Sequence, residues 1–295
     1  HFDAARIRNT TLPDNPESGI DYSLIALKKM FTEWDKAVDK GWPSIYLGNH
    51  DQPRMVSRFG SDKDEFRALS AKMLITFLLT MRGTPYWFAG DEIGMRNIRF
   101  DRIEDYNDID TINRYKKAKA EGKDPQAVLD EQKETGRDNA RTPFQWDRSP
   151  EAGFTAGTPW LKVNPDYTWI NVADEEKDPT SILNYFKKVV SFRKENPSLI
   201  YGSYHLLDAE NPQCYIFLRK TGADTYLIML NFSPKAAIST PGIDMSNAHV
   251  LLDNYGDRSH MAPQKDITLR PFEAIVFQLN HPVYESFIDS LDLLE

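Results

Sequence analysis

The hydrophobic positions of this chain repeat with two different spacings. Between residues 23 and 38, and again between 64 and 81, apolar side chains recur every three or four residues, which predicts an α-helix in each stretch. Two short apolar segments, 44–47 and 84–88, each end in a cluster of polar residues, which is typical of buried parallel strands that lead into loops. The alternation of strand and helix predicts an α/β fold whose chemistry lies at the carboxyl edge of a parallel sheet.

The middle of the chain is more polar. Residues 101–135 are charged and mostly helical in pattern, and they are too hydrophilic for a core helix of the sheet, so we interpret them as an excursion over the site. Residues 138–167 contain many prolines and glycines, which break any long element. A further helix is expected over residues 181–195, before the Asn-Pro pair at 196–197.

From residue 200 the pattern changes to short β-branched and aromatic runs separated by turn residues, which predicts a small all-β sandwich. The predicted organisation is therefore a β/α part, 1–198, a sandwich domain, 199–280, and an acidic tail, 281–295, to which no function is assigned. The predicted sandwich strands are 214–219, 225–232, 249–252 and 274–279.

Composition narrows the classes of function. A formal net charge of -8 and a pI near 5.4 argue against a nucleic-acid partner, because polyanion binding needs a basic surface. The most apolar run, Met73–Met81, is about half as long as a membrane-spanning helix, so no membrane partner is expected. The single cysteine, Cys214, excludes an intrachain disulfide and fits a reducing compartment, so we expect a cytoplasmic location. Residues 1–9 carry no leader pattern and predict a chain that starts in mid-fold.

The segment YLGNHDQPR, residues 46–54, contains the first candidate site. Directly beyond a buried strand, His50 and Asp51 are expected to point into the mouth of a barrel, where active sites of this architecture are built. The alternative is a simple turn in which Asp51 caps the next segment and His50 is a surface residue.

Longer motifs decide between these alternatives. The segments RGTPYWFAGDEIGM (82–95), GRDNARTPFQWD (136–147) and AGFTAGTPWLKVNPDY (152–167) resemble, in order and spacing, the oligo-1,6-glucosidase and α-glucosidase branch of the α-amylase superfamily. The resemblance covers nearly the whole chain, from residue 2 to about residue 280. It implies the C-terminal part of a (β/α)8 TIM barrel followed by the β-sandwich, and an oligosaccharide substrate. Residues 1–198, the barrel part, would then be the last three β/α units of the catalytic barrel.

The resemblance also implies roles for individual residues. Asp51 matches the third catalytic carboxylate, which stays ionised and bonds hydroxyls of the sugar at the cleavage point, and His50 matches a neighbouring donor to the same ring. Because the transition state is oxocarbenium-like, a fixed anion and fixed donors favour the distorted ring over the relaxed substrate. Arg137 matches the arginine that holds the non-reducing end, although a loop-anchoring salt bridge is the alternative role and Arg141 is the competing candidate.

Other candidates are less specific. Arg6 and Arg8 lie where the loop after the sixth barrel strand would contact the leaving sugar, but isolated loop arginines are commonly solvated. Glu92 follows the last strand and is expected either to border the site or to cap the helix beyond it. Phe144 is a candidate wall for sugar stacking, and its alternative place is the core.

Three departures from the resembled family limit this transfer. Ala89 and Asp91 stand where many relatives have Gln and Glu, and Gly48 replaces a common Asn before the Asn-His-Asp triplet. We expect these changes to affect linkage preference and not to remove the catalytic aspartate.

The resemblance begins at the sixth barrel strand. In this family the nucleophile and the general acid follow the fourth and fifth strands, so both are expected in an N-terminal half of the barrel that this chain requires as a partner. The loop that carries structural calcium in some relatives belongs to that half as well, and no cofactor or metal is expected in this chain. Alone, the chain is predicted to be inactive.

The predicted function is retaining exo-hydrolysis of α-glucosidic bonds in short isomalto- or malto-oligosaccharides. One rival is a sucrose isomerase or another transglycosylase of the same family, although the loop at residues 3–9 lacks the Arg-Leu-Asp-Arg-Asp string of that group. Another is a non-enzymatic binding subunit, as in the transporter heavy chains that share this fold. The intact Asn-His-Asp triplet at 49–51 argues against the second.

Overall fold

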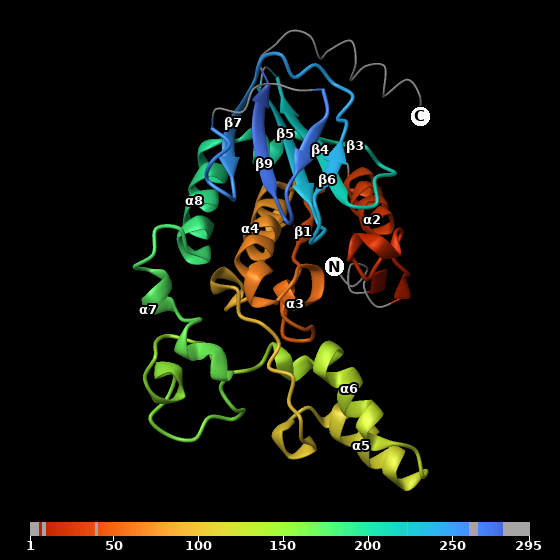
Figure 1. Ribbon diagram of the computed structural model, residues 1–295, viewed down its shortest axis with the longest axis vertical. Helices are drawn as coiled ribbons and strands as arrows, with labels where there is room; N and C mark the ends of the chain where they lie inside the picture. The colour runs from red at the N-terminus through yellow and green to blue at the C-terminus, as the bar shows by residue number, and fades with distance from the viewer. Residues whose placement is uncertain (1–5, 8–9, 39–40, 223, 260–264, 280–295) are drawn as a thin grey trace. The chain divides into compact units, whose positions relative to one another are not determined.

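The computed structural model describes residues 6–7, 10–38, 41–222, 224–259 and 265–279 (Figure 1). The predicted acidic tail therefore lies outside the described residues. The α-helices are α2 (Leu24–Ala37), α3 (Met55–Phe59), α4 (Asp64–Thr80), α5 (Ile109–Ala120), α6 (Pro125–Thr135), α7 (Val172–Glu175), α8 (Ile182–Glu195) and α9 (Ser198–Tyr201). The strands are β1 (Ser44–Ile45), β2 (Thr84–Pro85), β3 (Ser203–Leu207), β4 (Cys214–Thr221), β5 (Asp224–Asn231), β6 (Ala237–Ser239), β7 (Ala248–Asp253), β8 (Ile267–Leu269) and β9 (Ala274–Leu279).

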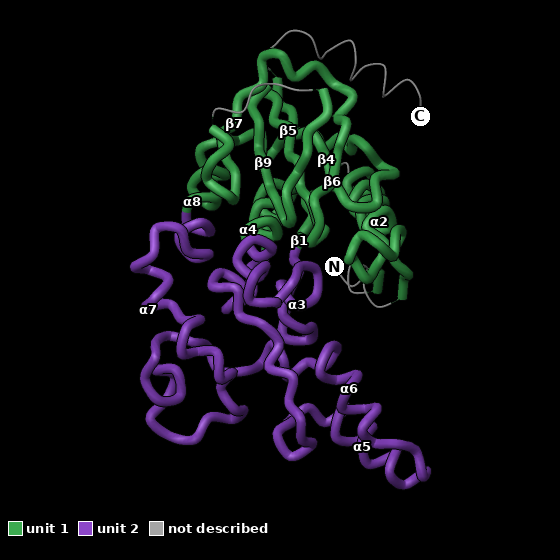
Figure 2. Tube along the Cα trace, in the orientation of Figure 1, with its two compact units in different colours: residues 1–45, 72–85, 188–295 green, residues 46–71, 86–187 purple. Residues whose placement is uncertain are grey.

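The chain forms two compact units (Figure 2). Unit 1 contains residues 1–45, 72–85 and 188–295, and unit 2 contains 46–71 and 86–187. The limits of the units pass through α4 and α8, so they differ from the division at 198 that the sequence pattern suggests. Unit 1 joins pieces of the barrel part to the sandwich, whereas unit 2 holds the candidate site.

The barrel part contains the predicted parallel pair of strands. β1 pairs with β2, with Ser44 opposite Thr84 and Ile45 opposite Pro85. Both strands are shorter than the predicted 44–47 and 84–88. Proline has no N–H to donate, so the ladder has no donor at Pro85. The strand expected at the start of the chain lies outside the described residues.

Helix α4 is the buried helix that the apolar run predicts. Every residue from 73 to 80 is buried, and Phe77 packs edge-on against Phe31 of α2, with 5.3 Å between ring centroids. The N-cap of α2 is Ser23, whose side chain accepts the N–H of Ala26, as expected for serine at this position. The predicted helical character of 101–135 is confirmed as two helices, α5 and α6.

The C-terminal part is a sandwich of two sheets. One sheet has the order β3-β4-β5-β9-β7, and the second contains β6 and β8; β4, β5 and β9 lie side by side in Figure 1. All pairings in both sheets are antiparallel. The core includes apolar side chains from both sheets, such as Leu227, Met229, Ile267 and Leu269. The prediction missed β3, β6 and β8, which are five, three and three residues long.

Lys28 of α2 is fully buried in unit 1. Its Nζ atom donates to the carbonyl oxygens of Asp208, Asn211 and Cys214 at 3.0, 2.8 and 3.3 Å. Burial lowers the pKa of Lys28 to about 8, although the charge of Asp208 opposes this shift. The thiol of Cys214 is itself buried, and burial raises its pKa to about 12.

Two arginines of unit 1 are buried as well. Arg193 donates to four backbone carbonyls, including that of Leu199 at 2.9 Å. Arg219 of β4 donates to the carbonyls of Thr80, Leu199 and Gly202. The carbonyl of Thr80 belongs to the last turn of α4, where carbonyls have no partner within the helix and attract positive charge. The two guanidinium groups therefore join the end of α4 to the first strands of the sandwich.

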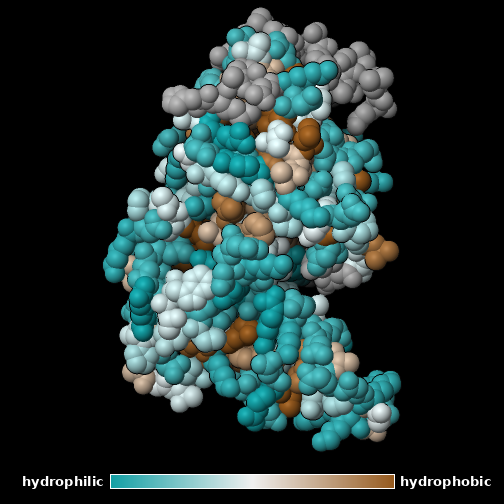
Figure 3. All heavy atoms as spheres, in the orientation of Figure 1, coloured by the Kyte–Doolittle hydropathy of each residue, from teal (hydrophilic) through white to brown (hydrophobic). Residues whose placement is uncertain are grey.

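Hydrophilic residues cover most of the face shown in Figure 3, and hydrophobic residues appear there in small separate groups. No helix in the part of the chain that the structure describes is both long and apolar enough to cross a bilayer.

Candidate functional site

The segment after β1 presents two polar side chains to solvent. Asn49 accepts the N–H of Asp51 on its side-chain oxygen at 2.8 Å, which closes a tight turn. The turn leaves the side chains of His50 and Asp51 exposed, at 73% and 46%. The imidazole Nε2 of His50 lies 3.4 Å from Oδ2 of Asp51. The two side chains therefore lie on an exposed turn, five and six residues after the end of β1, and their position in the mouth of a barrel stays a prediction.

Two arginines face the other oxygen of Asp51. Arg141 Nη2 lies 2.9 Å from Asp51 Oδ1, and Arg141 Nε donates to the carbonyl of His50 at 2.8 Å. Arg137 Nη1 lies 3.7 Å from the same Oδ1. Both arginines come from the turn that follows α6, where Arg137–Asn139 form a short 3-10 helix. Of the two competing candidates, Arg141 makes the closer contact with Asp51.

A buried carboxylate lies behind the two arginines. Asp108 is 4% exposed, and its Oδ1 lies 2.5 Å from Arg137 Nη2 and 3.5 Å from Arg141 Nη1. Asp138 Oδ1 is 3.8 Å from Arg141, while its Oδ2 accepts the backbone N–H of Asp108 at 2.8 Å. The sequence analysis missed both aspartates.

Asp108 has two separate tasks. It is the N-cap of α5, and its Oδ2 accepts the N–H and the hydroxyl of Thr111. Burial opposes ionisation, but the hydrogen bonds from Thr111 and the charge of Arg137 outweigh it and lower the pKa of Asp108. The pattern Asp-Ile-Asp-Thr at 108–111 is a capping signal that sequence inspection can find. No local pattern says that the second oxygen faces two arginines.

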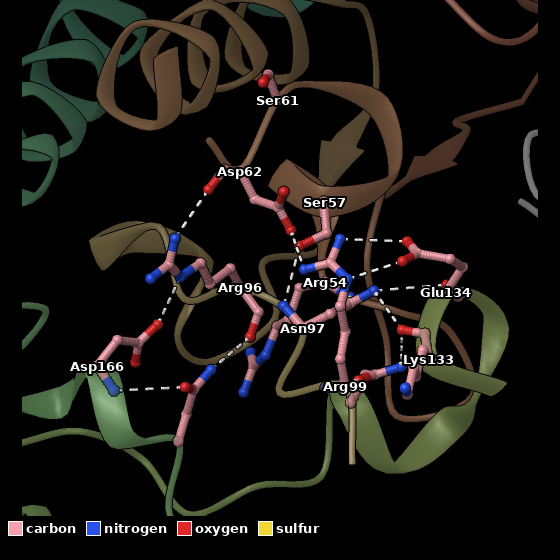
Figure 4. Close-up of polar contacts among 12 residues, drawn as sticks. Arg54, Ser57, Ser61, Asp62, Arg96, Asn97, Arg99, Lys133, Glu134 and Asp166 are labelled. Carbon is pink, nitrogen blue, oxygen red and sulfur yellow. Dashed lines mark hydrogen bonds and ion pairs between the residues drawn. The ribbon is translucent and has the colours of Figure 1, made fainter. Parts of the chain in front are cut away.

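Segment 96–99 contacts both Arg54, three residues after Asp51, and Glu134, three residues before Arg137 (Figure 4). The side-chain oxygen of Asn97 accepts the N–H of Arg54 at 2.9 Å, next to the Asp51 turn. Arg99 forms ion pairs with Asp62 and with Glu134 of α6, at 2.7 and 2.8 Å. Arg96 pairs with Asp64 and Asp166 at 2.7 and 2.8 Å.

Arg54, three residues after Asp51, forms a buried ion pair with Asp91. Arg54 donates to the carbonyl of Ala89 at 2.6 Å and lies 3.9 Å from Asp91. Burial raises the pKa of Asp91 to about 7, and the charge of Arg54 opposes this shift. A Cβ atom at Gly48 would lie 2.6 Å from Asp91 Oδ2, closer than any real Cβ contact. The departures at positions 48 and 91 are therefore sterically linked.

The remaining predicted residues are not part of this cluster. Glu92 accepts the N–H of Gly90 at 2.8 Å and the indole N–H of Trp87, so it stabilises the turn after β2. Phe144 packs against the core cluster around Ile93, which is the alternative place considered for it. Arg6 is exposed on a helical turn of unit 1, and its contact with a leaving sugar stays a prediction. Arg8 lies outside the described residues.

This arrangement can bind a neutral polyhydroxyl ligand. An accessible carboxylate accepts hydrogen bonds from hydroxyl groups, while guanidinium N–H groups donate to hydroxyl oxygens in fixed directions. Within the described ranges, no group of three or more His, Cys, Asp or Glu side chains is arranged to hold a metal ion. The ion pairs described around Asp51 join the guanidinium groups of Arg137 and Arg141 to the carboxylates of Asp51, Asp108 and Asp138.

Comparisons with known proteins find similar curated proteins over most of this chain. The oligo-1,6-glucosidase of Parageobacillus thermoglucosidasius is 48% identical over 265 residues, which cover 88% of this chain and 47% of that protein. The Bacillus cereus oligo-1,6-glucosidase is 46% identical, covering 87% of this chain and 46% of that protein. The chain thus spans about half the length of the curated relatives it matches.

Solved structures give the same result. The trehalulose synthase from Pseudomonas mesoacidophila MX-45 matches with a TM-score of 0.82 at 38% identity, over 88% of this chain and 47% of that one. A Bacillus licheniformis trehalose-6-phosphate hydrolase variant matches with a TM-score of 0.86 at 35% identity, over 95% of this chain and 51% of that one. These likenesses identify the described fold as the C-terminal part of a (β/α)8 barrel with an attached sheet domain.

The family model described as the alpha amylase catalytic domain matches residues 3–202, which include the Asp51 turn and both site arginines. The chain belongs to the alpha-amylase family.

Proposed function

We propose that this chain is the C-terminal half of a retaining, exo-acting α-glucosidase that hydrolyses α-glucosidic bonds in short oligosaccharides. The observation that carries the proposal is the accessible carboxylate of Asp51, which has an imidazole on one oxygen and two guanidinium groups on the other. The names of the most similar curated relatives support the same reaction class. The cytoplasmic location expected from the single cysteine belongs to this proposal.

The roles follow from the chemistry of glycoside cleavage. As the ring approaches the oxocarbenium-like transition state, Asp51 accepts hydrogen bonds from ring hydroxyls and stabilises the developing positive charge. Arg141 fixes the Asp51 carboxylate by its contact at 2.9 Å. Arg137 has remaining guanidinium donors for the terminal sugar, which favours cleavage at a chain end. The nucleophile and the acid are supplied by the other half of the barrel.

The test is made on the complete enzyme, in which this chain is joined to the preceding barrel half. Asp51→Asn should leave folding intact and reduce the turnover of a chromogenic α-glucoside by several orders of magnitude. The chain of residues 1–295 alone should be inactive, because its partial barrel lacks the nucleophile and exposes a sheet edge. Retention of more than about a tenth of wild-type turnover, a loss below about 1.4 kcal/mol, would exclude this role of Asp51.

A second candidate is isomerisation of sucrose, which is favoured by the likeness to trehalulose synthase. Product analysis separates the two functions, because an isomerase returns a disaccharide whereas a hydrolase releases glucose and fructose. A complete protein that binds oligosaccharides and releases no product would support the non-enzymatic alternative.

A further inference from the structure

We infer that Arg99 is a positioning residue, which holds the turn carrying Arg137 and Arg141 in place against the turn carrying Asp51. The inference rests on the function proposed above and concerns a side chain that has no described contact with Asp51 itself. Three features of segment 96–99 support it.

The first feature is the attachment of the segment to the Asp51 side. Asn97 is 4% exposed, and its side-chain oxygen accepts the N–H of Arg54, three residues after Asp51, at 2.9 Å. The N–H of Asn97 in turn donates to the hydroxyl of Ser57 at 2.9 Å. Arg99 Nη1 adds an ion pair to Asp62 at 2.7 Å. These contacts attach segment 96–99 to residues 54–62, so we expect the two to move together.

The second feature is the attachment of segment 96–99 to the end of α6, just before the turn that contains Arg137 and Arg141 (Figure 4). Arg99 Nε and Nη2 bind the two oxygens of Glu134 at 2.8 and 3.2 Å, a bidentate pair that fixes direction as well as distance. The N–H of Arg99 donates to the side chain of Asn139 at 3.0 Å. Glu134 and Asn139 lie on either side of Arg137 in the sequence. Arg99 therefore contacts both ends of the turn that contains Arg137.

The third feature is the backbone of Arg99. Its φ is +56°, in the left-handed region that residues other than glycine seldom adopt. Such a conformation persists where surrounding contacts impose it, and here the three contacts of Arg99 do so. With this backbone conformation, the side chain of Arg99 contacts Glu134 while Asn97 accepts the N–H of Arg54.

Arg96 provides a matched control. It lies on the same segment, and it also pairs with one carboxylate near the start of α4, Asp64, and with one more distant carboxylate, Asp166. Asp166 is 4% exposed, so the loss of Arg96 should cost at least as much stability as the loss of Arg99. Arg96 makes no described contact with the end of α6 or with the 137–141 turn.

The experiment compares Arg99→Met with Arg96→Met in the complete enzyme. Arg99→Met should lower kcat/KM about thirtyfold, since a shift near 1 Å of a site group has effects of this order, while Arg96→Met should change it less than about twofold. Arg99→Lys should recover part of the loss, because lysine keeps the charge but not the bidentate contact. In an Arg141→Ala background, the effect of Arg99→Met should fall to about tenfold or less, because only the position of Arg137 can then still be lost.

The outcomes are distinguishable. Equal losses of kcat/KM from Arg96→Met and Arg99→Met, or full additivity of Arg99→Met with Arg141→Ala, would overturn the positioning role while leaving the proposed function intact. A wild-type complete enzyme with no activity on α-glucosides or sucrose would instead overturn the proposed function.

Discussion

Two arginines of unit 1, Arg193 and Arg219, and two of unit 2, Arg137 and Arg141, use their guanidinium groups in opposite ways. In unit 1, the described hydrogen bonds of Arg193 and Arg219 all end on backbone carbonyls, and burial lowers the pKa of these groups to about 10 and about 9. In unit 2, Arg137 and Arg141 are about one third exposed and face the carboxylates of Asp51 and Asp108.

The difference separates structural arginines from site arginines. A guanidinium whose donors are all used by carbonyls has no hydrogen bond left for a ligand, so its contribution is to stability. A guanidinium that shares a carboxylate with a second guanidinium and remains in contact with solvent keeps donors for a substrate. Substitutions in the two groups should therefore have separable effects on stability and on activity.

The largest effect is expected at Arg219. In the complete protein, Arg219→Met should lower the free energy of unfolding by roughly 4 kcal/mol, because it removes the described donors of the buried Thr80 and Gly202 carbonyls, while Leu199 keeps the donor from Arg193. Urea unfolding measures this loss. Arg114→Met removes an exposed pair with Glu131 and should cost less than about 1 kcal/mol. Similar losses in both variants would remove the distinction between buried and exposed arginines.

The next effect concerns activity. Arg141→Ala should lower kcat/KM about a hundredfold, or about 2.7 kcal/mol, because it releases the Asp51 carboxylate. Arg137→Ala should raise the Michaelis constant about tenfold and weaken the preference for terminal sugars, with little change in the urea midpoint. Arg148→Ala, which removes an exposed pair with Asp174, is the control. A loss from Arg141→Ala with none from Arg137→Ala would show that the resemblance selected the wrong arginine.

A third effect is spread over a range of pH. The carboxyl group of Asp91 ionises near pH 7 in the folded protein and near pH 4 when unfolded, so the folded state binds more protons between these values. Its stabilising effect is complete below about pH 4 and is lost as the pH rises to about 7. Asp91→Asn does not titrate, so its unfolding free energy should rise relative to wild type by about 1 kcal/mol per pH unit.

Urea midpoints at pH 4.5, 6 and 7.5 test this dependence on pH. A constant difference between Asp91→Asn and wild type across this range would mean that Asp91 is ionised throughout.

The sequence predicts the long, strongly periodic elements well. The helix expected at 23–38 is α2, Leu24–Ala37, and that expected at 64–81 is α4, Asp64–Thr80. Short strands were missed or overextended, because β6 and β8 have three residues each and carry too little pattern. The limits of β1 and β2 are set by pairing with a neighbour, which a local window does not contain.

The site could be predicted only where it depends on local sequence, and not where it depends on contacts between distant segments. His50 and Asp51 come five and six residues after β1 and lie in one tight turn, so their placement depends on local sequence. Asp108 reaches Arg137 from 29 positions away, and this proximity arises from the packing of α5 against α6. Arg99 is similar, since its left-handed backbone and its partners depend on three segments distant in sequence.

The single thiol makes the opening of unit 1 measurable. Cys214 is completely buried at the start of β4, and burial raises its pKa to about 12, so the folded form offers almost no thiolate to an alkylating reagent. Labelling then proceeds through transient opening of the sheet. When reclosing is faster than alkylation, the ratio of the labelling rates of the folded protein and of an unfolded peptide gives the equilibrium constant for opening. The protein thus carries its own reporter of local opening next to the carbonyls that bind Lys28.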